Sequence, residues 1–191
     1  MRVVGGEARG RRLAAPPGRV TRPTSDRVRE AVFGVLGSLA PATGRPIEGA
    51  GVADLFAGSG ALGIEALSRG AARAVFVDQD RQAAATIDAN LATLGMQARA
   101  TVVRGDALRW LRTATPCDVT FADPPYDFDR WSELLSLLGP VTGLAVLEMG
   151  AARVLDAGWE VLREKHYGGT VVVVARPARF SEPAHDRKGD A

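Results

Sequence analysis

Residues 51–64 read GVADLFAGSGALGI, and this stretch decides the fold. The apolar run at 52–56 is typical of a buried strand, the glycines after it predict a tight turn, and the residues from Ala61 favour a helix. Gly58 and Gly60 permit backbone angles that a Cβ would forbid, and they let a ligand approach the main chain closely. Free N–H groups at the helix start would face that ligand. Alone, the stretch indicates either a tight connection or a cofactor site.

An acid near the end of this strand, Asp54, separates the stretch from phosphate-binding loops. Neither the G-x-G-x-x-G spacing directly after a strand nor the G-x-x-x-x-G-K-[ST] loop is present. Asp54 would repel a phosphate, whereas it would attract an ammonium group. The methionine part of S-adenosylmethionine (AdoMet) carries an ammonium and a carboxylate, so the pattern favours this ligand. The sequence acid-x-F-x-G-x-G resembles the first motif of the class I AdoMet-dependent methyltransferases.

Length and charge suggest one domain with a basic arm. The chain has 191 residues, of which 46% are hydrophobic, enough for a single core. Residues 1–30 hold eight arginines against three acids, although the net charge of the whole chain is only +2. Such an arm favours an anionic partner, most often nucleic acid; the alternative is a solvated end that reflects a bias toward arginine. We expect residues 1–20 to form a basic β-hairpin or extended arm, residues 21–176 the methyltransferase domain, and residues 177–191 a disordered tail.

Other features of composition narrow the class of protein. Cys117 is the single cysteine, so no internal disulfide can form and a reducing cytoplasm fits. No cysteine–histidine cluster suggests a metal site. No apolar run approaches the roughly 20 residues of a membrane span, and the N-terminus lacks the apolar core of a signal peptide. The sequence therefore predicts a cytoplasmic protein without a metal.

From residue 51 onward, strand and helix patterns alternate. Strands are expected at 52–56, 73–78, 99–104, 118–122, 144–148, 159–166 and 170–176, and helices at 61–68, 80–94, 107–113 and 128–138. Gly168-Gly169 between the last two strands predicts a hairpin. A parallel series that ends in an antiparallel pair is an α/β fold, the Rossmann-like seven-stranded sheet of class I methyltransferases. Upstream, Thr24 or Ser25 should cap a helix that reaches Leu39, and residues 41–50 should form a linker.

Four acids come at or just after the ends of successive strands: Asp54, Asp78, Asp106 and Asp123. Ligands of open α/β sheets bind outside the carboxyl ends of the strands, so we expect these acids to share one edge. Asp78 lies about 20 residues after the glycine turn, where a carboxylate can accept both ribose hydroxyls. Asp106 either accepts from the adenine amino group or caps the next helix.

The sequence Asp123-Pro124-Pro125-Tyr126 follows the fourth expected strand. Its plain interpretation is a proline turn with a packed tyrosine. Two prolines, however, fix the backbone and remove two donors, so the Asp123 carboxylate and the Pro124 carbonyl are held as acceptors. They suit the two N–H donors of an exocyclic amine, and Tyr126 can stack on a base that has left its helix. The motif resembles the [D/N]-P-P-[Y/F] sequence of amino-methyltransferases that act on nucleic-acid bases.

Taken together, residues 1 to about 176 resemble the RsmD family of bacterial 16S rRNA guanine-N2 methyltransferases. The resemblance rests on the basic arm, RPTSDRVRE at 22–30, DLFAGSGALGIEALSRGA at 54–71, and DPPY at 123–126. It implies that AdoMet methylates guanine N2 in 16S rRNA, with the assembled small ribosomal subunit or a late precursor as the partner. The residues alone indicate only an amino-methyltransferase that acts on a nucleobase.

These motifs together predict the site residues. The catalytic residues are Asp123, Pro124, Pro125 and Tyr126. The cofactor contacts are Asp54, Phe56, Ala57, Gly58, Gly60, Asp78, Gln79, Asp106, Ala107 and Asp123. The substrate contacts are Arg2, Arg9, Arg11, Arg12, Arg22, Thr24 and Arg27, the last three of which either line the target pocket or belong to a helix cap.

Two rival functions share some of these features. A DNA adenine-N6 or cytosine-N4 methyltransferase would use the same DPPY chemistry, but the chain has little room for a domain that reads DNA sequence. A non-catalytic RNA-binding assembly factor could keep the fold, although the intact DPPY motif argues against it.

Overall fold

A seven-stranded sheet forms the centre of the computed structural model, which describes residues 1–17, 25–44, 47–150, 155 and 158–178. The strand order is β3-β2-β1-β4-β5-β7-β6. The strands are β1 Gly51–Leu55, β2 Arg73–Asp78, β3 Ala100–Arg104, β4 Cys117–Ala122, β5 Thr142–Met149, β6 Trp159–Tyr167 and β7 Thr170–Pro177. The first five pair in parallel, whereas β7 is antiparallel to both β5 and β6. The predicted class I methyltransferase sheet is therefore confirmed.

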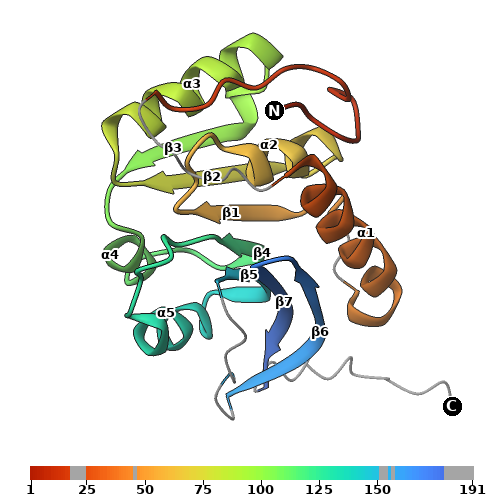
Figure 1. Cartoon of the computed structure of the whole chain (residues 1–191), viewed down its shortest axis with the longest axis vertical. Helices are drawn as coiled ribbons and strands as arrows, with labels where there is room; N and C mark the ends of the chain where they lie inside the picture. The colour runs from red at the N-terminus through yellow and green to blue at the C-terminus, as the bar shows by residue number, and fades with distance from the viewer. Residues whose placement is uncertain (18–24, 45–46, 151–154, 156–157, 179–191) are drawn as a thin grey trace, which may run out of the picture.

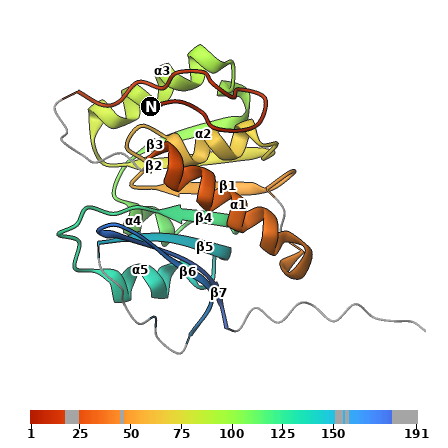
Figure 2. The same ribbon diagram turned by 45° about the vertical axis from the view of Figure 1, so that its right-hand side comes forward.

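Helices cover both faces of the sheet (Figures 1 and 2). They are α1 Asp26–Thr43, α2 Ala61–Ser68, α3 Arg81–Leu94, α4 Ala107–Leu111 and α5 Trp131–Leu138, with a short 3-10 helix at Gln97–Arg99. Apolar residues of α1, α2 and α3 share one core cluster with Phe76 and Phe121, while α4 and α5 pack with Val77 and Ala122. Successive strand residues thus serve opposite cores, as the pleat requires.

Several predicted boundaries differ from the structure: the helix expected at 128–138 begins at Trp131, and the helix expected at 107–113 ends at Leu111. The expected linker at 41–50 begins later, because α1 continues through Pro41 to Thr43. Pro41 lies in the last turn, where a missing N–H removes a single helical bond. The helix ends instead at Gly44, whose φ of 63° is left-handed and whose N–H donates to the carbonyl of Ala40.

The expected tail also begins later than residue 177. Pro177 pairs with Trp159 in the sheet, and the N–H of Ala178 donates to the carbonyl of Gly158 over 2.8 Å. The rest of the predicted tail lies outside the described residues. At the other end of the chain, residues 1–17 (the arm) make a single antiparallel bridge, Arg2 with Arg12. In both views this red segment runs over α2 and α3 (Figures 1 and 2).

Candidate cofactor and substrate site

A cavity of about 610 Å³ opens at the carboxyl ends of the parallel strands. It brings together nearly all residues that the sequence assigns to cofactor and catalysis: Asp54, Phe56, Ala57, Gly58, Asp78, Gln79, Asp106, Ala107, Asp123, Pro124, Pro125 and Tyr126. Gly60 does not line the cavity. It is the N-cap of α2, with φ of 76°, and an added Cβ would come within 3.2 Å of Ile87. Gly60 therefore allows the tight turn into α2 and does not itself contact the cavity.

Two strand-end carboxylates hold the glycine turn and the first turn of α2. Asp78 Oδ2 accepts from the N–H of Gly58 over 2.8 Å, and Asp54 Oδ2 accepts from the N–H of Gly63 over 2.8 Å. Phe56 and Gly58 both adopt φ of 57°, which tightens the chain as it leaves β1. The acids predicted to contact the cofactor thus also fix the glycine turn and the start of α2 beside the cavity.

Asp54 is buried, and its surroundings change its charge. Burial raises the pKa of Asp54 to about 8; the hydrogen bond from Gly63 opposes this rise, while the negative charges of Asp123 and Asp78 add to it. The carboxyl therefore holds a proton near neutral pH. A cation placed against it would favour the ionised form.

This raised pKa predicts a pH-dependent stability. In the unfolded chain Asp54 loses its proton near 3.8, whereas in the fold it keeps the proton to about pH 8. The contribution of this raised pKa to the free energy of unfolding is fully present below the pKa of the unfolded chain. It is lost as pH rises through the pKa of the folded protein. Asp54→Asn keeps an oxygen acceptor for Gly63 but cannot ionise. As pH rises from about 5 to about 9, the free energy of unfolding of this variant should increase relative to that of wild type by on the order of 1 kcal/mol or more.

Urea unfolding of the apo protein at these two pH values measures the effect. Asp88→Asn, which changes an exposed carboxylate on α3, serves as the control. A difference between wild type and Asp54→Asn that stays constant with pH would show that Asp54 is already ionised in the fold.

Asp78 and Asp106 both line the cavity and also accept hydrogen bonds from backbone N–H groups. The second oxygen of Asp78, Oδ1, accepts from the N–H of Asp80 over 2.9 Å. Asp106 caps α4 by accepting from the N–H of Arg109 over 2.8 Å, and it also lines the cavity. The helix-cap interpretation of Asp106 is therefore confirmed, and its position also suits contact with a ligand.

The DPPY motif forms a corner at the other side of the cavity. Pro124 is buried, Asp123 is half-buried, and the side chain of Tyr126 lies in the open, with 68% of the residue exposed. The N–H of Phe128 donates to the carbonyl of Pro125 over 2.9 Å and closes the corner. The Phe128 ring packs edge-on against Phe56, with ring centroids 5.3 Å apart, so the corner contacts the glycine turn directly.

The ring of Tyr126 rests on the sheet. An added Cβ at Gly150 would come within 2.5 Å of Tyr126 Cδ1, and the Tyr126 hydroxyl lies 3.5 Å from Thr170 Oγ1. One side of the ring is therefore supported while most of the residue remains exposed. Such a supported aromatic ring can serve as a stacking platform.

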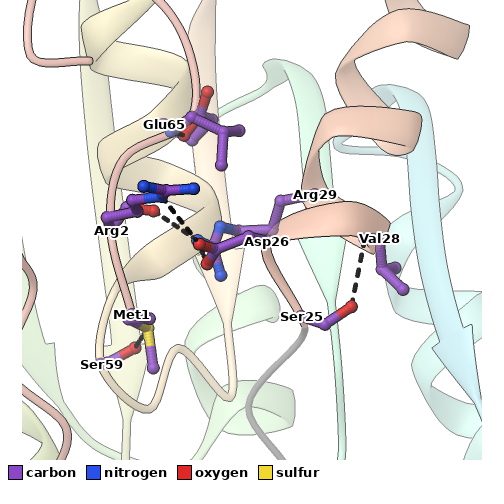
Figure 3. Close-up of polar contacts among 9 residues, drawn as sticks. Met1, Arg2, Ser25, Asp26, Val28, Arg29, Ser59 and Glu65 are labelled. Carbon is purple, nitrogen blue, oxygen red and sulfur yellow. Dashed lines mark hydrogen bonds and ion pairs between the residues drawn. The ribbon is translucent and has the colours of Figure 1, made fainter. Parts of the chain in front are cut away.

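The predicted substrate contacts divide into two groups. Arg2, Arg9, Arg11, Arg12 and Arg27 are exposed, which fits contact with an anionic surface. Two of these also make internal contacts, since Arg2 pairs with Asp26 over 3.3 Å and Arg11 donates to the carbonyl of Thr93 over 2.9 Å. Arg22 and Thr24 lie outside the described residues. Ser25, the alternative cap, accepts from the N–H of Val28 and is confirmed as the N-cap of α1 (Figure 3).

Sequence reasoning missed several residues of the cavity wall. Glu148, half-buried near the end of β5, is a fifth strand-end acid and could have been found by the same pattern. Met1, Ala15 and Pro16 of the arm also line the cavity. No local signal marks them, because their position depends on how the arm packs on α2 and α3.

Other kinds of site find no support in the described part of the chain. There, no group of histidine, cysteine and acidic side chains could hold a metal ion. Nor does any helix in these ranges have the length and hydropathy to cross a membrane.

Comparisons with known proteins agree with this geometry. Residues 1–176 match the family model described as "Conserved hypothetical protein 95". A curated relative from Escherichia coli (strain K12), "Ribosomal RNA small subunit methyltransferase D", is 40% identical over 88% of this chain and 85% of its own length. Another from Bacillus subtilis (strain 168), "Putative rRNA methyltransferase YlbH", is 43% identical over 72% of this chain and 73% of its own.

A solved structure supports the same assignment. The protein described as "Putative methyltransferase yhhF from Escherichia coli" is 38% identical, with a TM-score of 0.78 over 93% of this chain and 97% of that chain. The strand-end acids, the glycine turn and the DPPY corner meet around one cavity, as a class I methyltransferase requires. On these grounds the chain belongs to the "Conserved hypothetical protein 95" family, which is the RsmD family of methyltransferases.

Proposed function

We propose that this protein transfers a methyl group from AdoMet to the exocyclic N2 of a specific guanine in 16S rRNA, within the small ribosomal subunit or a late precursor. The observation that carries the proposal is that the DPPY corner and the glycine turn open onto one cavity. The E. coli relative, whose name states a small-subunit rRNA substrate, supports the RNA target.

The cavity suits AdoMet in size and in the chemistry of its walls. Its volume of about 610 Å³ falls within the roughly 300–1,000 Å³ of ligand sites. Asp78 would accept the ribose hydroxyls, Asp106 the adenine amine, and Asp54 lies where an ammonium group would be balanced. Phe56, Ala57 and Gln79 also line the cavity. When bound, AdoMet supplies a methyl group on a positively charged sulfur.

The corner would orient the base amine. The Asp123 carboxylate and the Pro124 carbonyl would accept its two hydrogens, which turns the nitrogen lone pair toward the methyl group. The nitrogen gains positive charge as it reacts, and the Asp123 carboxylate stabilises that charge. Tyr126 would stack on the guanine after it leaves its helix. The methylated nitrogen is acidic enough to lose its proton without a strong base.

Glu148 favours guanine over the rival base adenine. Ala122 of β4 pairs with Leu147 of β5, so the next residues, Asp123 and Glu148, are neighbours at the edge of the sheet, and both line the cavity. Guanine presents two adjacent donors, N1–H and the N2 amine, whereas adenine presents an acceptor at N1. Two carboxylates accept hydrogen bonds and donate none, which matches guanine.

Glu148→Gln should lower kcat/KM for RNA roughly tenfold, because an amide replaces one acceptor by a donor at the guanine edge. AdoMet affinity should remain unchanged. Glu160→Gln, which alters an exposed carboxylate on β6 paired with Arg176, is the matched control. Equal activity of both variants would remove Glu148 from base recognition.

Methyl transfer from labelled AdoMet tests the proposed reaction. The substrates are small ribosomal subunits from cells that lack this enzyme and, separately, duplex DNA. The expected product is N2-methylguanosine in 16S rRNA after digestion to nucleosides. Label in DNA adenine or cytosine would support the DNA methyltransferase instead. AdoMet binding with no methylated product would support the assembly factor.

A further inference from the structure

We propose that the arm is a wall of the cofactor cavity, that its docking on α2 and α3 sets the affinity for AdoMet, and that Asn90 is the residue that positions it. The inference rests on the proposed function for the identity of the ligand. It goes beyond that function because it gives the basic arm a second role, distinct from contact with RNA.

The inner side of the arm reaches the glycine turn. Met1, Ala15 and Pro16 line the cavity, and Pro16 is buried. The hydroxyl of Ser59, in the glycine turn, donates to the sulfur of Met1 over 3.3 Å (Figure 3). The arm therefore forms part of the cavity wall beside the glycine turn.

Side chains of helix α2 bind backbone groups of the arm. The buried carboxylate of Glu65 accepts from the N–H of Val4 over 2.8 Å. The Ser68 hydroxyl accepts from the N–H of Ala8 over 2.9 Å and donates to the carbonyl of Gly5 over 2.6 Å. These bonds involve backbone groups of the arm, so they fix its path and leave its arginine side chains outside.

Helix α1 holds the arm from another direction. Arg29 has no exposed surface, and its Nη2 donates to the carbonyl of Arg2 over 2.5 Å and to Asp26 Oδ1 over 2.7 Å (Figure 3). Asp26 in turn pairs with Arg2. A buried guanidinium needs such partners, so the arm and α1 stabilise each other.

Asn90 of α3 joins the arm to the glycine turn. Its Oδ1 accepts from the N–H of Ala14 over 2.9 Å, and its Nδ2 donates to the carbonyl of Ala14 over 3.1 Å and to that of Ser59 over 3.0 Å. The side chain is only 4% exposed. Three bonds from one buried amide thus align Ala14, beside the wall residues, with the turn that faces the cofactor.

Deleting the arm would remove the wall and the arginines together, so point substitutions are needed to separate the two roles. Gly6 and Gly10 form a matched pair. Both have left-handed φ, 74° and 83°, so alanine strains each backbone similarly. A Cβ at Gly6 would lie 1.8 Å from the Ser68 carbonyl oxygen, whereas a Cβ at Gly10 meets nothing within 4 Å. Gly6→Ala should lift the arm from α2, and Gly10→Ala should leave it docked.

Calorimetric titration of the full chain with AdoMet, without RNA, measures the consequence. Gly6→Ala should weaken AdoMet binding roughly tenfold relative to Gly10→Ala, because the displaced arm loses contacts with the turn. Asn90→Asp is the second variant, for use also where Gly6→Ala does not fold. It loses both donors and sets a carboxylate against two carbonyls. Thr86→Val, on the same helix, is its control, because it removes a hydroxyl that donates to the carbonyl of Gln82 within α3.

Turnover separates positioning from general damage to the fold. Asn90→Asp should raise KM for AdoMet roughly tenfold while kcat at saturating AdoMet and KM for RNA change less than about twofold. Wild-type AdoMet affinity in folded Gly6→Ala or Asn90→Asp would overturn the inference and leave the arm as an RNA contact. A wild-type protein that binds no AdoMet would instead overturn the proposed function.

Discussion

Replacing Asp123 by alanine should lower kcat for methyl transfer roughly 100- to 1,000-fold at saturating AdoMet. The carboxylate is half-buried at the cavity, where a charge interacts more strongly than in water. In the proposed mechanism, its loss removes both an acceptor that orients the amine and the negative charge that stabilises the attacking nitrogen. Single-turnover methylation of small subunits measures the effect free of product release. Asp88→Ala, which removes an exposed carboxylate of α3, is the control for net charge.

Asp123→Asn separates the contribution of the hydrogen-bond acceptor from that of the negative charge. Asparagine keeps a carbonyl oxygen but carries no charge, so its rate should lie between those of wild type and Asp123→Ala. An asparagine variant as slow as the alanine variant would assign most of the effect to charge. Near-normal turnover by Asp123→Ala, with unchanged AdoMet affinity, would remove Asp123 from the reaction.

Tyr126→Ala should lower kcat/KM for RNA roughly 10- to 100-fold, which corresponds to the loss of one base–aromatic stack. Affinity for AdoMet should stay close to wild type, because the proposed role of the ring is to hold the flipped base. Tyr126→Phe should remain within about threefold of wild type, since the hydroxyl makes one long contact, 3.5 Å, with Thr170.

The phenylalanine variant decides what the tyrosine contributes. If Tyr126→Phe were as slow as Tyr126→Ala, the hydroxyl rather than the ring would matter. If both variants matched wild type, the exposed ring would have no part in binding the base. Melting temperatures of the two variants should be similar to wild type, because the side chain lies in the open.

The sequence predicted most of the fold and most of the strand-end residues that line the cavity. The acids at or near the ends of β1, β2, β3 and β4 could be placed together because parallel strands end at one edge and ligands bind there. Their local partners were harder to predict. Asp78 also holds the glycine turn through Gly58, and Asp54 holds the first turn of α2 through Gly63; that arrangement depends on how α2 packs on the sheet.

Local pattern was enough for the strands, the helices and the DPPY corner, because hydrophobic period, glycine turns and prolines act over a few residues. It also identified the arm as basic. Which side of the arm faces inward was decided by tertiary contacts: Val4 meets Glu65 and Ala14 meets Asn90 across 61 and 76 residues of chain. A composition rich in arginine describes the outer surface of the arm only, whereas the docking of the arm uses its backbone groups, which no sequence pattern marks.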